Sequence, residues 1–144
     1  MTWRTPFFLM TALLLTVPAA RADDGERVLV VEPLPGTPEH LIQQVFVAAQ
    51  FDDFRGFYGD LCHRDTCTLT DVAMKSFQAG PWEKFKANFK RCLVDEDSLS
   101  YKYERMSPKK LTPRTNKVTF YFEGGSMILK KDAEGAWKIY RLCE

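Results

Sequence analysis

The sequence lacks the short motifs by which many enzymes can be recognised. It has no glycine-rich phosphate loop, no Gly-x-Ser-x-Gly nucleophile elbow and no His-Glu-x-x-His zinc helix. It also has no internal repeat and no low-complexity tract. Its formal net charge of +1 gives no basic excess of the kind that favours nucleic acid as a partner. The sequence therefore indicates neither a motif-bearing enzyme nor a nucleic-acid-binding protein, and it requires no cofactor.

A long apolar run is also missing. The run at the start, Phe7–Val17, is well short of the ~20 apolar residues that a membrane-spanning helix needs. It follows the basic Arg4 and precedes an Ala-x-Ala pattern that ends at Ala22, which is typical of a secretory signal peptide. No cysteine follows this cleavage site, which disfavours a lipoprotein. We therefore expect residues 1–22 to be a signal peptide and the mature protein to be periplasmic or secreted, with no integral membrane segment.

The remaining chain is long enough for one domain. Residues 23–36 begin with charged residues and end with Pro and Gly, so we expect a linker there, in which Arg27–Val31 could pair as an edge strand. Residues 37–144 then have about the length of a single domain with one core.

The first half of this domain has the apolar spacing of helices. Thr37 is followed by proline and an acid, as at a helix start. Further helices are expected from Asp52 or Asp53, over residues 71–77, and over residues 81–93 after a restart at Gly80-Pro81. One apolar stripe supports the last of them: Trp82, Phe85, Phe89 and Leu93.

In the second half the apolar period changes to two, which is typical of strands. Four strands are expected, at residues 99–104, 118–122, 127–129 and 137–139. The turn sequences at 123–125 and 132–135 are short enough for hairpins. Helices followed by an antiparallel sheet predict an α+β fold with the helices on one face.

Four segments carry a resemblance to a known family: TPEHLIQQVFVAAQFDDF, KVTFYFEGG, SMILKKDAEG and AWKIYRL. In this order they resemble the nuclear-transport-factor-2-like superfamily, and in particular the exported bacterial domains of unknown function called lumazine-binding-like. The resemblance implies a cystatin-like curved sheet wrapped around helices as a cone, with a cavity between them. Members of the superfamily are isomerases, dehydratases or cyclases, ligand-binding modules, or dimerisation domains. The resemblance therefore leaves the function open.

Residues 61–67, LCHRDTC, invite three interpretations. Zinc would need about four ligands, and the segment offers only Cys62, His63 and Cys67. A redox pair would favour the tighter Cys-x-x-Cys spacing. An exported chain with four cysteines more often forms two disulfides. Three connectivities are open, and we favour Cys62 with Cys67 and Cys92 with Cys143, without a metal.

Two arginines are candidates for ligand binding. Strict alternation would place Arg105 on the face of Tyr101 and Tyr103, and Arg141 on the face of Trp137. There a guanidinium group beside tyrosine hydroxyls could hold an anion at the mouth of an apolar cavity. The alternative is that both arginines lie at the sheet edge, with their stems over apolar surface and their charges in water.

These observations favour a small exported domain that is not an enzyme and that binds a small molecule or a protein partner. One alternative is an isomerase, dehydratase or cyclase whose pocket contains Tyr101, Tyr103, Glu104 or Arg105. Another is a dimerisation or structural module that forms a homodimer through its sheet.

Overall fold

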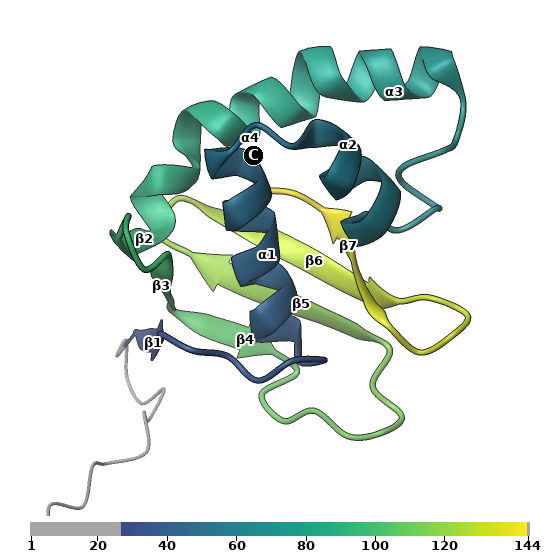
Figure 1. The fold of residues 1–144 in the computed structure, drawn as a ribbon. Coiled ribbons are helices and arrows are strands. Elements are labelled where there is room, and N and C mark those ends of the chain that lie inside the picture. Colours follow the sequence, from purple (N-terminus) through teal and green to yellow (C-terminus); the bar gives the residue numbers. More distant parts are fainter. Residues whose placement is uncertain (1–26, 144) are drawn as a thin grey trace, which may run out of the picture.

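The computed structural model describes residues 27–143. The expected signal peptide at residues 1–22 lies outside the described residues. Within them, helices cover one side of antiparallel sheets (Figure 1), so the α+β class is confirmed. No helix in the range 27–143 has the length and apolar character needed to cross a membrane.

The helical elements come first along the chain. They are α1 (Pro38–Gln50), α2 (Phe54–Gly56), the π-helical turn η1 (Phe57–Leu61), α3 (Asp71–Phe77), the π-helical turn η2 (Gln78–Trp82), α4 (Glu83–Asn88) and the 3-10 turn η3 (Phe89–Cys92). The strands are β1 (Val28–Val30), β2 (Leu93–Asp95), β3 (Ser100–Tyr103), β4 (Arg105–Ser107), β5 (Lys117–Phe122), β6 (Gly125–Lys131) and β7 (Trp137–Arg141).

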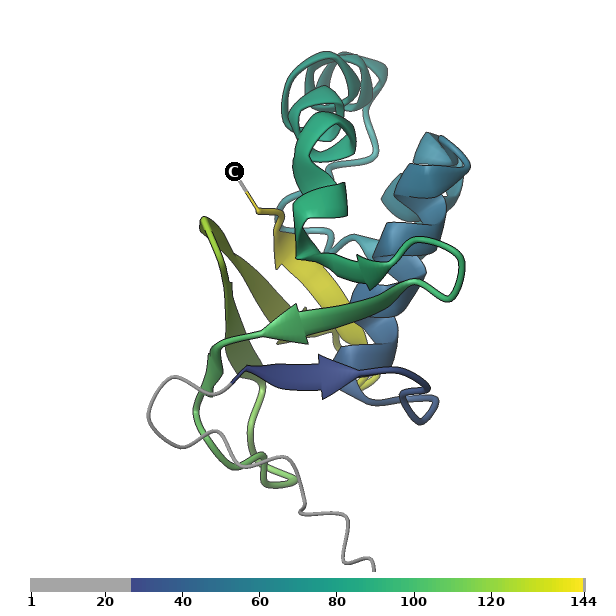
Figure 2. The ribbon, with the colours of Figure 1, turned by 90° about the vertical axis from the view of Figure 1, so that its left-hand side faces the viewer.

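The strands form two antiparallel sheets, ordered β1-β3-β2 and β4-β5-β6-β7. β1 lies within the expected linker and pairs with β3, which confirms the edge strand. Figure 2 shows the first sheet turned away from the second. The expected hairpins join β5 to β6 and β6 to β7, with Gly124 and Gly135 at φ values of 86° and 83°, which other residues rarely adopt.

The expected first helix start is confirmed, and one acid, Asp53, shapes the turn after α1. Thr37 caps α1 by accepting a hydrogen bond from the backbone N–H of His40. Asp53 caps α2 by accepting from the N–H of Gly56 at 3.0 Å. Gly56 lies so close to this cap that a Cβ atom there would be 2.2 Å from the Asp53 carboxylate. A side chain at position 56 would therefore displace the cap.

Gly80-Pro81 does not restart the chain, contrary to the expectation. α3 continues through η2 into α4 (Figure 1). A proline inside an α-helix removes one backbone donor and clashes with a carbonyl of the preceding turn. Here the wider π-helical turn contains Pro81, so the helical course continues past it.

The expected strand 99–104 is also different. Leu99 has a φ of 55° and precedes β3, which ends at Tyr103. After Glu104 the chain enters the other sheet as β4. The segment that the sequence predicts as a single strand thus belongs to two sheets. The chain changes direction between them, and this change decides on which face Arg105 lies.

Aromatic rings fill the space between helices and sheets. Phe46 of α1 is fully buried and lies at the centre of this packing. Its ring contacts those of Phe85, Phe89, Tyr101 and Phe122, with centroids 5.2–6.5 Å apart. The interior at this level is therefore a packed aromatic core.

Candidate functional site

The two tyrosines proposed from the sequence are part of this core. Tyr101 is fully buried, and its hydroxyl donates a hydrogen bond of 2.7 Å to the carbonyl oxygen of Glu39. Tyr103 packs edge-on against Phe120, with ring centroids 4.9 Å apart. Burial raises the pKa of Tyr101, and it raises the pKa of Tyr103 to about 12. Both hydroxyls therefore stay protonated at neutral pH.

Arg105 lies on the opposite face from these tyrosines, which corrects the expectation from alternation. In β4 the residue that packs against the core is Met106, opposite the buried Phe120. Arg105 pairs with Tyr121 on the outer face, away from the helices, and its guanidinium carbon lies 3.9 Å from the centre of the Tyr121 ring. The break at Glu104 reverses the faces because the strand direction changes there.

Arg141 also changes face, this time at a β-bulge. Leu129 pairs with Ile139, whereas the preceding residue Ile128 pairs with Arg141, so Tyr140 is an extra residue in β7. Ile139 is buried in the core, while Arg141 is exposed opposite Ile128. Simple alternation would have placed Ile139 and Arg141 together, and the bulge separates them.

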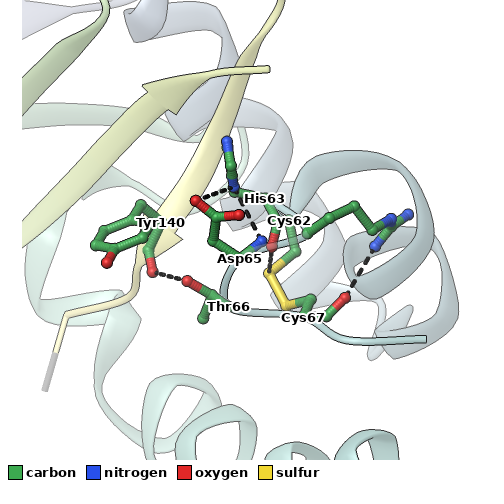
Figure 3. Close-up of polar contacts among 7 residues, drawn as sticks. Cys62, His63, Asp65, Thr66, Cys67 and Tyr140 are labelled. Atoms are coloured by element: carbon green, nitrogen blue, oxygen red, sulfur yellow. Dashed lines mark hydrogen bonds and ion pairs between the residues drawn. A yellow bond between two sulfur atoms is a disulfide. The ribbon is translucent and has the colours of Figure 1, made fainter. Parts of the chain in front are cut away.

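The loop of residues 62–67 accounts for this bulge. The backbone N–H of His63 donates to the carbonyl oxygen of Ile139 at 2.7 Å. The hydroxyl of Thr66 donates to the carbonyl oxygen of Tyr140 at 2.6 Å (Figure 3). Carbonyls of consecutive residues in a regular strand point to opposite edges, but here both point toward the loop. The loop thereby stabilises the local geometry that turns Arg141 outward.

A disulfide closes the same loop. Cys62 and Cys67 are joined, with Cα atoms 5.9 Å apart, and both are almost completely buried (Figure 3). Between them, the Nδ1 atom of His63 accepts from the N–H of Asp65 at 3.1 Å and lies 3.6 Å from its carboxylate. Among residues 27–143, no three or more His, Cys, Asp or Glu side chains are grouped to hold a metal ion.

Arg105 and Arg141, which the sequence placed on separate apolar faces, both line one cleft on the outer face of the second sheet. The cleft has a volume of about 460 Å³. Its lining residues are Glu104, Arg105, Tyr121, Phe122, Gly125, Ser126, Arg141 and Leu142. Its charged residues are two arginines and one glutamate, and the carboxylate of that glutamate, Glu104, lies 3.9 Å from the guanidinium group of Arg27. The cleft is therefore suited to a negatively charged group.

Tyr121 and Ser126 were not recognised from the sequence as cleft residues. They pair with each other across β5 and β6, and Tyr121 also pairs with Arg105. In the sequence Tyr121 alternates with Phe120 and Phe122, which are buried. An aromatic residue on the outer face of the strand was therefore the signal that could have identified Tyr121 as a cleft residue.

Trp137 belongs to a different place. It lines a second cleft of about 400 Å³ with residues of α1 and η1, among them His40 and Asp60. The ammonium group of Lys131 lies 5.1 Å from the centre of its indole ring. The five proposed ligand residues are thus divided: two tyrosines in the core, two arginines in the outer cleft and Trp137 near α1.

Cys92 and Cys143 have free thiols. They are neighbours: both line a cleft of about 150 Å³, and the Cys143 thiol is the main influence that lowers the pKa of Cys92. The expected second disulfide is not formed in the structure, although the pairing partners lie side by side.

No protein-family model matches the chain, and searches of curated proteins and solved structures give no significant match. The resemblance to the nuclear-transport-factor-2-like superfamily therefore stays a prediction. The case for a function depends on the geometry of the clefts.

Proposed function

We propose that this chain is an exported domain, not an enzyme, that binds an anionic group in the cleft between Arg105 and Arg141. The observation that carries the proposal is that Arg105 of β4 and Arg141 of β7 line the same cleft. A guanidinium group offers paired N–H donors that match the oxygens of a carboxylate or phosphate. The ligand class is accordingly a carboxylate or phosphate, either on a small molecule or on the surface of a partner.

Different contacts hold the two arginines in place. Arg105 is stacked on the ring of Tyr121, an arrangement that stabilises a cation and restricts its side chain. The backbone at Arg141 is held by the bulge and by the hydrogen bonds of the 62–67 loop. Groups that are ordered before binding lose less conformational entropy when the ligand arrives.

The cleft favours binding over turnover. A general base or acid works best in a position that tunes its pKa toward the working pH, commonly by burial. The carboxylate in this cleft, from Glu104, is 45% exposed and faces Arg27. An enzyme of the isomerase, dehydratase or cyclase type therefore has less support than an anion-binding domain.

Export and the cone-like fold belong to the same proposal. The Cys62–Cys67 disulfide supports an oxidising compartment, because such bonds are rare in reducing ones. The helices on one side of the sheets support the cone-like arrangement of the nuclear-transport-factor-2-like superfamily. Since aromatic rings fill the core around Phe46, we place the ligand on the outer face of the sheet.

Isothermal titration calorimetry with inorganic phosphate and with citrate tests the proposal, with glycerol as the uncharged control. Arg105→Gln and Arg141→Gln should each weaken binding about tenfold or more, because each removes charge-assisted hydrogen bonds. Arg114→Gln changes an exposed arginine in the 108–116 connection and should leave the affinity unchanged. Equal affinities for all three variants would overturn the assignment of the cleft.

The absence of binding to both anions would refute a free small-molecule ligand. Light scattering after size-exclusion chromatography would then separate the remaining sources of the anionic group. A dimer that Arg105→Gln dissociates would place the group on a second copy of the chain. A monomer at micromolar concentration would contradict the homodimer.

A further inference from the structure

The two free thiols lie where separate parts of the fold meet. Cys92 is the last residue of η3, and Cys143 follows shortly after β7. Both are partly buried, and both line the cleft that also contains Phe89 and Arg91. Their surroundings differ from those of Cys62 and Cys67, which are 2% and 0% exposed.

The two thiols are chemically unequal. The hydrogen bond from Cys143 is the main influence that lowers the pKa of Cys92, against the opposing effect of burial. The same hydrogen bond, followed by burial, raises the pKa of Cys143. Cys92 is therefore the more easily formed thiolate, and the thiolate is the form that attacks a disulfide.

We infer that Cys92 and Cys143 are an exchangeable dithiol site that closes to a second disulfide by reaction with an external disulfide. The oxidant class is a small-molecule disulfide or the disulfide of an oxidoreductase. Because Arg141 lies two residues before Cys143, closure would fix the segment that carries this arginine to the end of η3.

The reaction takes place in two exchange steps. The Cys92 thiolate attacks one sulfur of the external disulfide, forms a mixed disulfide and expels one thiolate, which takes up a proton. Cys143 then loses its proton and attacks the Cys92 sulfur, which forms the Cys92–Cys143 bond and expels the second thiolate. Two protein thiols are oxidised to one disulfide, and one external disulfide is reduced to two thiols.

The effect on the cleft depends on the proposed anion-binding function. With the Cys143 segment tied to η3, Arg141 would have fewer accessible positions, so less entropy is lost on binding. We expect the closed form to bind phosphate about threefold or more tightly than the open form, in the direction that preorganisation predicts. The exchange chemistry itself does not depend on this effect.

Alkylation with iodoacetamide followed by peptide mapping tests the dithiol site. In protein treated with a mild reductant, Cys92 and Cys143 should be alkylated. After treatment with oxidised glutathione they should be protected and recovered as one cross-linked peptide. Cys143→Ser should instead accumulate a glutathione adduct on Cys92, because the thiol that resolves the mixed disulfide is missing.

The outcomes separate the two proposals. Alkylation of both thiols after glutathione treatment would overturn the exchange site, and a Cys143→Ser variant without a glutathione adduct on Cys92 would overturn the order of attack. The Cys62→Ser/Cys67→Ser variant keeps Cys92 and Cys143 and should still form the bond between them. This result would show that formation of the second disulfide is not limited by a fold that needs the first. Closure without phosphate binding in either form would refute a free phosphate ligand in the cleft and leave the dithiol site intact.

Discussion

The hydroxyl of Thr66 donates a hydrogen bond of 2.6 Å to the carbonyl oxygen of Tyr140 and so joins two segments 74 residues apart in sequence. Together with the bond from His63 to Ile139, it fixes the end of β7 to the disulfide loop. The next residue along the strand is Arg141, which lines the outer cleft. The loop that first suggested a metal or redox centre is thus a support for a residue of the proposed anion site.

Thr66→Val should remove the bond to Tyr140 while keeping the shape of the side chain. We expect a loss of about 1 kcal/mol in the free energy of unfolding, because a carbonyl oxygen loses its partner. The affinity for phosphate should also fall, since Arg141 is less well held. Urea unfolding and calorimetry measure the two effects. Thr68→Val, at an exposed position of the same segment, is the control and should change neither.

Replacing Cys62 and Cys67 together with serine should lower the free energy of unfolding by about 2 kcal/mol without abolishing the fold, as expected for a short closed loop. Thermal unfolding of the oxidised protein is the measurement. An unchanged melting temperature under oxidising conditions would show that the bridge contributes nothing to stability.

Asp52→Asn should reduce stability at neutral pH but not at low pH. Lys86, at 2.9 Å, and the indole N–H of Trp82 both stabilise the Asp52 carboxylate and lower its pKa. This stabilisation is present above the unfolded-state pKa of about 3.9 and disappears as the pH falls through the lower folded-state value. Asparagine tolerates the positive φ of 52° at this position, so the substitution isolates the charge.

The pH dependence of urea unfolding tests this account. Wild type and Asp52→Asn should differ at pH 7 and converge near pH 2. Asp97→Asn, at an exposed acid outside this contact, serves as the comparison. A difference that stays constant over the whole pH range would contradict the role of the charge.

The variant Tyr101→Phe tests whether the ligand binds inside the core or in the outer cleft. The variant loses the hydrogen bond to Glu39 and should be destabilised by about 1 kcal/mol. Its affinity for phosphate should equal that of the wild type, because Tyr101 is on the core side of the sheet. A large loss of affinity, in protein shown by circular dichroism to be folded, would instead favour a ligand inside the cone.

The α+β class and most elements could be predicted because they depend on local signals. Thr37 and Thr70 cap the expected helices, and Gly124 and Gly135 mark the expected hairpins. The continuous helical course through Pro81 could not be predicted, because a π-helical turn has no clear local signature.

The arginine positions could not be predicted for a related reason. Alternation assigns faces correctly only in an uninterrupted strand. The break at Glu104 and the extra residue Tyr140 each change the face, and both depend on contacts with distant segments. The sequence therefore identified Arg105 and Arg141 as candidates but placed them in the wrong surroundings.

We propose that Arg105 and Arg141 bind one anion together. The most direct measurement is the set of arginine side-chain Nε–H signals in the ¹⁵N NMR spectrum, assigned with the Arg→Gln variants, during titration with phosphate. The account predicts that the signals of Arg105 and Arg141 shift along one common saturation curve while that of Arg114 stays in place. Signals of Arg105 and Arg141 that do not move, or that move in parallel with Arg114, would contradict it.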